Sequence, residues 1–161
     1  MKEHSLRNGY LSPHFTLQEM IFSETAEANG INNNPPPIAL VQLYKLCNDV
    51  LEQVRSLCGD KPVMISSGFR CAELNQMIGG ATGSAHLYGC AADFTIPDYG
   101  DPLSVCKAIE PHLEEWGIDQ LIYECPSGVW VHLGIAIPPN DDPRCQTLTI
   151  TSSGTYSGLN M

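Results

Sequence analysis

The chain has 161 residues, of which 43% are hydrophobic and 16% are charged, a composition typical of a globular protein. Its net charge of −10, with eight dispersed Lys and Arg, excludes the clustered positive charge that nucleic-acid binding needs. No apolar run reaches the roughly 18 residues of a membrane span, so we expect no membrane insertion. The length predicts one domain over residues 1–161, with a core from about 15 to 137, and we expect a monomer.

The first residues and the cysteines indicate where the protein is made. Met1 to Tyr10 carries Lys2, Glu3 and Arg7 and no apolar run of signal-peptide length, so we expect cytoplasmic synthesis without an export signal. Seven Cys leave at least one thiol unpaired, and no Cys-x-x-Cys is present. Reduced thiols are the simpler interpretation.

The first half of the chain predicts two helices and a strand. Thr16-Leu17-Gln18-Glu19 has the form of a capping box, which predicts a short helix from Thr16. The Asn- and Pro-rich stretch from Gly30 to Pro37 ends that helix and starts the next. Apolar residues at three- and four-residue spacing predict a long helix from Ile38 to about Cys58, and Val63 to Ser66 reads as a strand.

The second half predicts a sheet with one more helix and a final tail. The expected elements are strands at Ala91–Ile96 and Gln120–Glu124, a helix at Pro102–Trp116, a hairpin strand at Val129–Ile135, and an edge strand at Leu148–Thr151. Ser152 to Gly158 is small and polar, which predicts a loose C-terminal tail. The fold class is α+β, a small antiparallel sheet with helices packed on one side.

Two short segments offer metal ligands. His86 precedes Asp93 by seven positions, from a loop into a strand, so both side chains can reach one ion. Trp130 and His132 point to one side of the returning hairpin strand, by the two-residue period. Two His and one Asp leave one position of a tetrahedral Zn²⁺ open, as is typical of catalytic sites.

Glu124 and Arg70 complete the candidate site. If the hairpin turn is centred on Gly128, Glu124 lies opposite His132, where its carboxylate can take a proton from a water and return it to a leaving amine. Arg70 ends the segment Ser66-Ser67-Gly68-Phe69-Arg70, at the edge of a sheet. Its guanidinium can hold a substrate carboxylate or stabilise an oxyanion.

These motifs stand in an order that resembles a known family. The order is similar to that of the zinc D-Ala-D-Ala carboxypeptidases of the M15 metallopeptidase family, and most of all to that of its phage and prophage members. The motifs are, in chain order, Ser-Gly-Phe-Arg, Asn, Gly-Gly, Ser-x-His-x-x-Gly-x-Ala-x-Asp, Glu and Trp-x-His. The resemblance runs from about Phe15 to Ile137 and includes Phe-Thr-Leu-Gln-Glu-Met and the Asn-x-Pro region.

The resemblance implies a function and assigns roles to residues. It implies a hedgehog and D-Ala-D-Ala-peptidase-like fold, a Zn²⁺ cofactor and a peptidoglycan peptide substrate cut as a carboxypeptidase or endopeptidase. A phage lysin released to the cell wall fits the lack of an export signal. The implied zinc ligands are His86, Asp93 and His132, with Arg70 on the substrate, Glu124 as the base, and Ser84, Asn75, Tyr88 and Trp130 as substrate contacts.

The sequence departs from the family pattern at one position, and it is compatible with two other functions. In several relatives the base lies three residues before the final His, and here that residue is Val129, so the hairpin argument moves the role to Glu124. A zinc-bearing binding or structural module with the same fold, as in the hedgehog signalling domain, is the first alternative. The second is a non-haem iron oxygenase, whose close His-x-Asp spacing is missing here.

Overall fold

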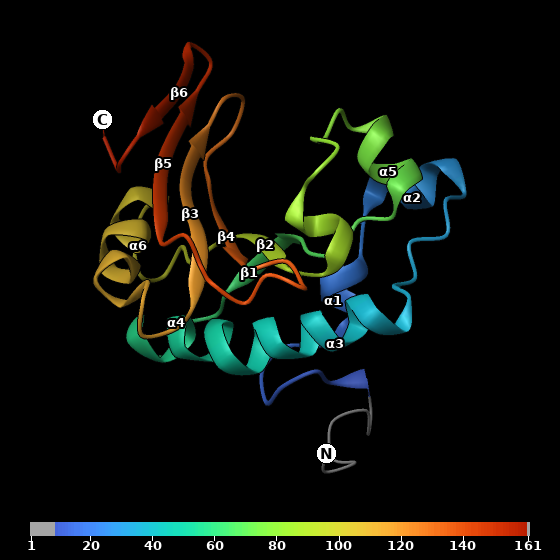
Figure 1. Ribbon diagram of the computed structural model, residues 1–161, viewed down its shortest axis with the longest axis horizontal. Helices are drawn as coiled ribbons and strands as arrows, with labels where there is room; N and C mark the ends of the chain where they lie inside the picture. Colours follow the sequence, from blue (N-terminus) through green and yellow to red (C-terminus); the bar gives the residue numbers. More distant parts are fainter. Residues whose placement is uncertain (1–8, 161) are drawn as a thin grey trace.

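The computed structural model describes residues 9–160 and shows helices around a single twisted sheet (Figure 1). Residues 1–8, on which the expectation about an export signal largely rests, lie outside the described residues. The helices are α1 (Leu17–Ile21), α2 (Glu24–Asn29), α3 (Pro37–Lys45), the π-helical η2 (Leu46–Leu51), α4 (Glu52–Leu57), α5 (Ala72–Met77), the 3₁₀-helix η3 (Ala85–Tyr88), α6 (Pro102–Ile109) and the 3₁₀-helix η4 (Glu110–His112). Among these, none is long and apolar enough to cross a membrane.

Local sequence signals account for the first helices. Thr16 and Glu19 form the predicted capping box, in which each side chain binds the backbone of the other residue at the start of α1. Pro37 occupies the first turn of α3, as predicted. From there α3, η2 and α4 run on as one long helix, visible along the lower edge of Figure 1.

The sheet has six strands in the order β1-β2-β4-β3-β5-β6. All neighbouring pairs are antiparallel except β3 and β5, which are parallel. The strands are β1 (Met64–Ser67), β2 (Ala91–Thr95), β3 (Ile118–Cys125), β4 (Trp130–Ile135), β5 (Gln146–Thr151) and β6 (Gly154–Ser157). The α+β class and the mostly antiparallel sheet confirm the predicted fold class.

The two faces of the sheet have different chemistry because side chains alternate along each strand. Phe94, Leu121 and Val131 point into the hydrophobic core, where they join the apolar stripe of the long helix and α6. The residues beside them in sequence, Asp93 and His132, therefore point to the opposite face. That face carries the candidate site.

Three details of the predicted elements are wrong. The helix that starts at Pro102 ends at Ile109 and not at Trp116, because Pro111 has no N–H for a further α-helical hydrogen bond. The predicted loose tail contains β6, whose pairing with β5 gives the tail a backbone partner. It follows that β5 is not the edge strand, since β3 and β6 flank it.

Candidate metal centre

Sheet register brings two of the predicted ligands together. Asp93 of β2 lies directly opposite His132 of β4 in an antiparallel pair. His86 comes from η3, which is followed by Gly89 in the left-handed conformation. A Cβ on Gly89 would lie 2.4 Å from the backbone oxygen of Ala39, so only glycine lets η3 approach the long helix this closely.

The three side chains converge on one point. His132 Nδ1 lies 2.8 Å from Asp93 Oδ1, and His86 Nε2 lies 3.2 Å from that oxygen and 3.3 Å from His132 Nδ1. His86 is 1% exposed and His132 is 8% exposed. Burial alone would raise the pKa of the Asp93 carboxyl, but the two facing imidazoles hold this pKa well below its usual range.

A backbone carbonyl decides which nitrogen of His86 is free. His86 Nδ1 lies 2.6 Å from Gly68 O, and a carbonyl can only accept, so Nδ1 carries the proton. The Nε2 lone pair of the neutral ring then points at Asp93 and His132. Burial lowers the pKa of His86 further than the Asp93 charge raises it, which favours this neutral form.

The donor set fits Zn²⁺. Imidazole nitrogen and carboxylate oxygen bind zinc at about 2.0–2.2 Å, which places tetrahedral ligands roughly 3.3 Å apart. Two of the three observed separations, 3.2 and 3.3 Å, match that spacing, and the third is shorter. The hydrogen bond from His86 to Gly68 is the kind of outer contact that orients a metal-bound histidine. The structure thus brings the three residues together, and their role as zinc ligands stays a prediction.

The chain around Gly68 is held by two close contacts. A Cβ on Gly68 would lie 2.3 Å from Met20 O, the same oxygen that accepts a 2.7 Å hydrogen bond from Phe69 N. Asn33 bridges the neighbouring backbone, because its side chain donates to Ile21 O and Phe69 O and accepts from Cys71 N. These contacts fix the carbonyl that orients His86.

Glu124 lies on the same face but one pair away from its predicted place. The register pairs Glu124 with Trp130 and Ile122 with His132, so the turn is centred one residue earlier than Gly128 and Glu124 is diagonal to His132. Trp130 Nε1 donates to Glu124 Oε2 at 3.2 Å. Burial and the charge of Asp93 raise the pKa of Glu124.

Arg70 has an unpaired buried nitrogen beside these carboxylates. Its Nε is buried and has no hydrogen-bond partner among the described residues. Burial lowers the pKa of Arg70, while the charges of Asp93 and Glu124 act in the opposite direction. Its backbone N donates to His86 O at 3.1 Å, which ties this cation to the metal-binding segment.

A cavity of about 690 Å³ opens over the site. Its lining includes Arg70, Glu124 and the three predicted ligands, together with the predicted substrate contacts Ser84 and Trp130. The other two predicted contacts lie outside the lining. Asn75 is buried and donates to Ala81 O, and Tyr88 is exposed at 45%.

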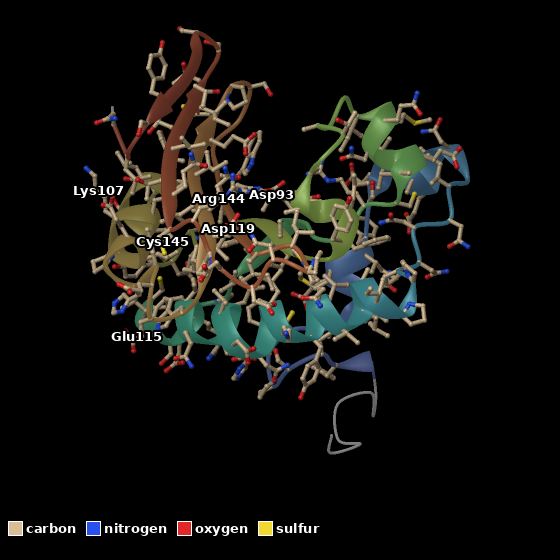
Figure 2. All side chains as sticks on the ribbon, viewed as in Figure 1. Asp93, Lys107, Glu115, Asp119, Arg144 and Cys145 are labelled. Atoms are coloured by element: carbon tan, nitrogen blue, oxygen red, sulfur yellow. The ribbon has the colours of Figure 1, made fainter. Side chains whose placement is uncertain are left out.

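Among the lining residues that were not predicted, Asp119 and Arg144 form an ion pair. Asp119, at the start of β3, accepts hydrogen bonds from the side chain and the backbone N of Arg144. The two residues are labelled close together in Figure 2. This pair ties the loop before β5 to the sheet at one end of the cavity. The one sequence signal that could have pointed to Asp119 is a charged residue next to the apolar residues of a strand. Asn33, which bridges the backbone near Gly68, also had no predicted role, although it lies within the Asn-x-Pro region.

Comparisons with known proteins show which sequences this chain is similar to. The sequence profile of the family described as Peptidase M15 matches residues 13–133, which is more than half of the chain. A curated zinc D-Ala-D-Ala carboxypeptidase from Streptomyces albus G is 44% identical over 55 residues, or 34% of this chain. That match spans 20% of the relative's own length.

Proposed function

The chain belongs to the Peptidase M15 family, and from this premise we propose that it is a zinc-dependent peptidase that hydrolyses amide bonds in peptidoglycan stem peptides. The observation that carries the proposal is the convergence of His86, Asp93 and His132 in a cavity that also holds Glu124 and Arg70. A D-Ala-D-Ala carboxypeptidase and a stem-peptide endopeptidase are the two activities in this class.

The residues divide the chemistry between them. His86, Asp93 and His132 would hold Zn²⁺, which when bound would supply a Lewis acid and lower the pKa of a bound water toward neutral pH. The Glu124 carboxylate takes the proton of the attacking water and passes it to the leaving amine, as the C–O bond forms and the C–N bond breaks. Trp130 holds one carboxylate oxygen of Glu124 by its indole N–H, which orients the group.

Arg70 supplies positive charge at the same site. Its buried Nε has no partner within residues 9–160, so a substrate oxygen that reaches it can accept the hydrogen bond that this nitrogen lacks. Arg70 also borders Asp93 and Glu124, and its charge partly balances theirs. We propose that it binds a substrate carboxylate or the oxyanion that develops during attack.

Two measurements test the proposal: the zinc content of the protein and the release of D-alanine from a stem pentapeptide. Both are made on the native chain and on Glu124→Gln. We expect stoichiometric zinc in both proteins and a kcat about 10²- to 10⁴-fold lower in the variant. Glu73→Gln changes an exposed carboxylate of α5 outside the cavity and serves as the matched control. Zinc without turnover on stems or whole walls would favour the non-catalytic zinc module, and a chain that binds no zinc would refute the proposal.

The cellular role is a further part of the proposal. We propose that the protein acts on the cell wall after release from the cell in which it is made, as a phage or prophage lysin does. Clearing of a suspension of isolated walls tests this role, and sedimentation velocity tests the predicted monomer.

A further inference from the structure

A second cavity adjoins the metal centre and takes no part in the chemistry above. Its volume is about 450 Å³, and it shares Ser67, Arg70 and Ile78 with the first cavity. The rest of its lining comes from the turn between α1 and α2, the start of α2, β1 with the segment that follows it, and α5. Arg70 therefore lies at the boundary between the two cavities.

The second cavity is lined by both apolar and polar side chains, and its rim is exposed. Phe69 and Leu74 are buried in its wall, while Phe22 and Ile78 lie at its rim with exposed fractions of 45% and 46%. The hydroxyls of Ser23, Ser66 and Ser67 add hydrogen-bonding groups. Exposed large apolar side chains around a cavity that shares lining residues with a candidate active site indicate a place for a ligand.

One wall of this cavity is an edge strand. β1 is the first strand of the sheet and pairs only with β2. Within residues 9–160, the backbone of β1 makes no hydrogen bond to any other segment. An extended peptide can pair with such an edge, and its main chain then supplies affinity while side chains enter nearby pockets.

We propose that the second cavity binds an extended part of the peptide substrate along the edge of β1, beyond the residues that flank the scissile bond. The occupant is a peptide with small or aliphatic side chains, because Phe22, Ile65, Phe69, Leu74 and Ile78 supply the apolar part of the wall. Among the described lining residues, Arg70 and Glu24 carry opposite charges, so the lining favours no strongly charged side chain of either sign. This inference rests on the proposed function, since the substrate enters through the cavity above the metal centre. Its consequence is that the enzyme favours longer peptides over dipeptides.

The test measures kcat and KM for a stem pentapeptide and for N-acetyl-D-Ala-D-Ala. Three proteins are compared: the native chain, Phe22→Ala and Ile78→Ala. We expect either substitution to raise KM for the pentapeptide roughly tenfold with little change in kcat, because an apolar contact is lost in binding. Ile38→Ala removes an exposed apolar side chain of α3 outside both cavities and is the control. Thermal unfolding shows whether each variant folds, and the second variant keeps the test valid if the first does not.

Binding of the pentapeptide by calorimetry separates this inference from the proposed function. Pentapeptide binding that weakens in both variants, without turnover by the native chain, would support the second cavity and refute the peptidase. Turnover of both substrates with equal kcat/KM, unaffected by either substitution, would support the peptidase and overturn the second cavity.

Discussion

Gly68 is the residue whose substitution tests the metal centre most directly. In Gly68→Ala the new Cβ would lie 2.3 Å from the backbone oxygen of Met20, where ordinary contacts need roughly 3.5 Å. Because that neighbour is backbone, the chain at Gly68 must move by about 1 Å, and overpacking of this kind costs about 1–3 kcal/mol of folding free energy.

The same displacement reaches His86. The Gly68 carbonyl accepts the hydrogen bond from His86 Nδ1 at 2.6 Å, and a shift of this size lengthens or breaks it. Loss of such an outer contact typically weakens metal binding by about 10- to 100-fold. We therefore expect Gly68→Ala to lower both the stability of the chain and its affinity for Zn²⁺.

Two assays measure these effects. Urea unfolding of the metal-free protein gives the change in stability, and competition with a chromophoric chelator gives the zinc affinity. Gly83→Ala is the matched control, because a Cβ there meets nothing within 4 Å and its backbone needs no positive φ. If Gly68→Ala unfolds and binds zinc like the native chain, the argument from the Met20 contact is refuted.

Three further predictions concern stability, pH and thiols. Asn33→Ala should cost about 1–3 kcal/mol in urea unfolding, because it leaves three part-buried backbone groups without their partner. Exposed Asn34→Ala should cost under about 0.5 kcal/mol, and equal costs would contradict the bridging role. Burial raises the pKa of Asp119, but hydrogen bonds from Arg144 outweigh this and lower it. The stability from this carboxylate is thus complete above its ordinary pKa and is lost as the pH falls through the lowered value. Unfolding at stepped pH should show an acid loss of stability that is smaller in Asp119→Asn, and identical profiles would refute the assignment. A disulfide-exchange reagent should react slowly with four buried thiols, since burial raises their pKa, to about 11 for two of them and about 12 for a third. Rapid reaction of all seven thiols would contradict the packing of Cys47, Cys58, Cys90 and Cys106.

A catalytic zinc site and a structural zinc module require different residues around the metal. A structural zinc site is normally closed by four protein ligands, whereas the described residues bring three together, and it has no use for a carboxylate and a guanidinium beside them. Glu124 and Arg70 lie in the same cavity as the ligands. Their presence there supports catalysis over a structural metal, and the Glu124→Gln experiment separates the two.

Local chemistry made several parts of the structure predictable from sequence. The capping box of Thr16 and Glu19, the proline start at Pro37 and the helical spacing that follows depend on near neighbours, and all three are confirmed. The order of motifs also identified the family, because it does not require knowledge of the fold.

Register and the tail depended on long-range partners. The hairpin was placed one residue off because the turn centre cannot be read from Pro126, Ser127 and Gly128 alone, and this moved Glu124 from opposite to diagonal to His132. β6 forms from a small, polar segment since β5 offers it a partner, which no local signal reports.

The sequence alone determined which residue types form the candidate site and which family pattern they follow. Only the tertiary structure decided that Gly68 O orients His86, that Arg70 borders two cavities, and that Asp119 binds Arg144. The physical reason is that these contacts join segments far apart in the chain, and their geometry follows from how the sheet and helices pack.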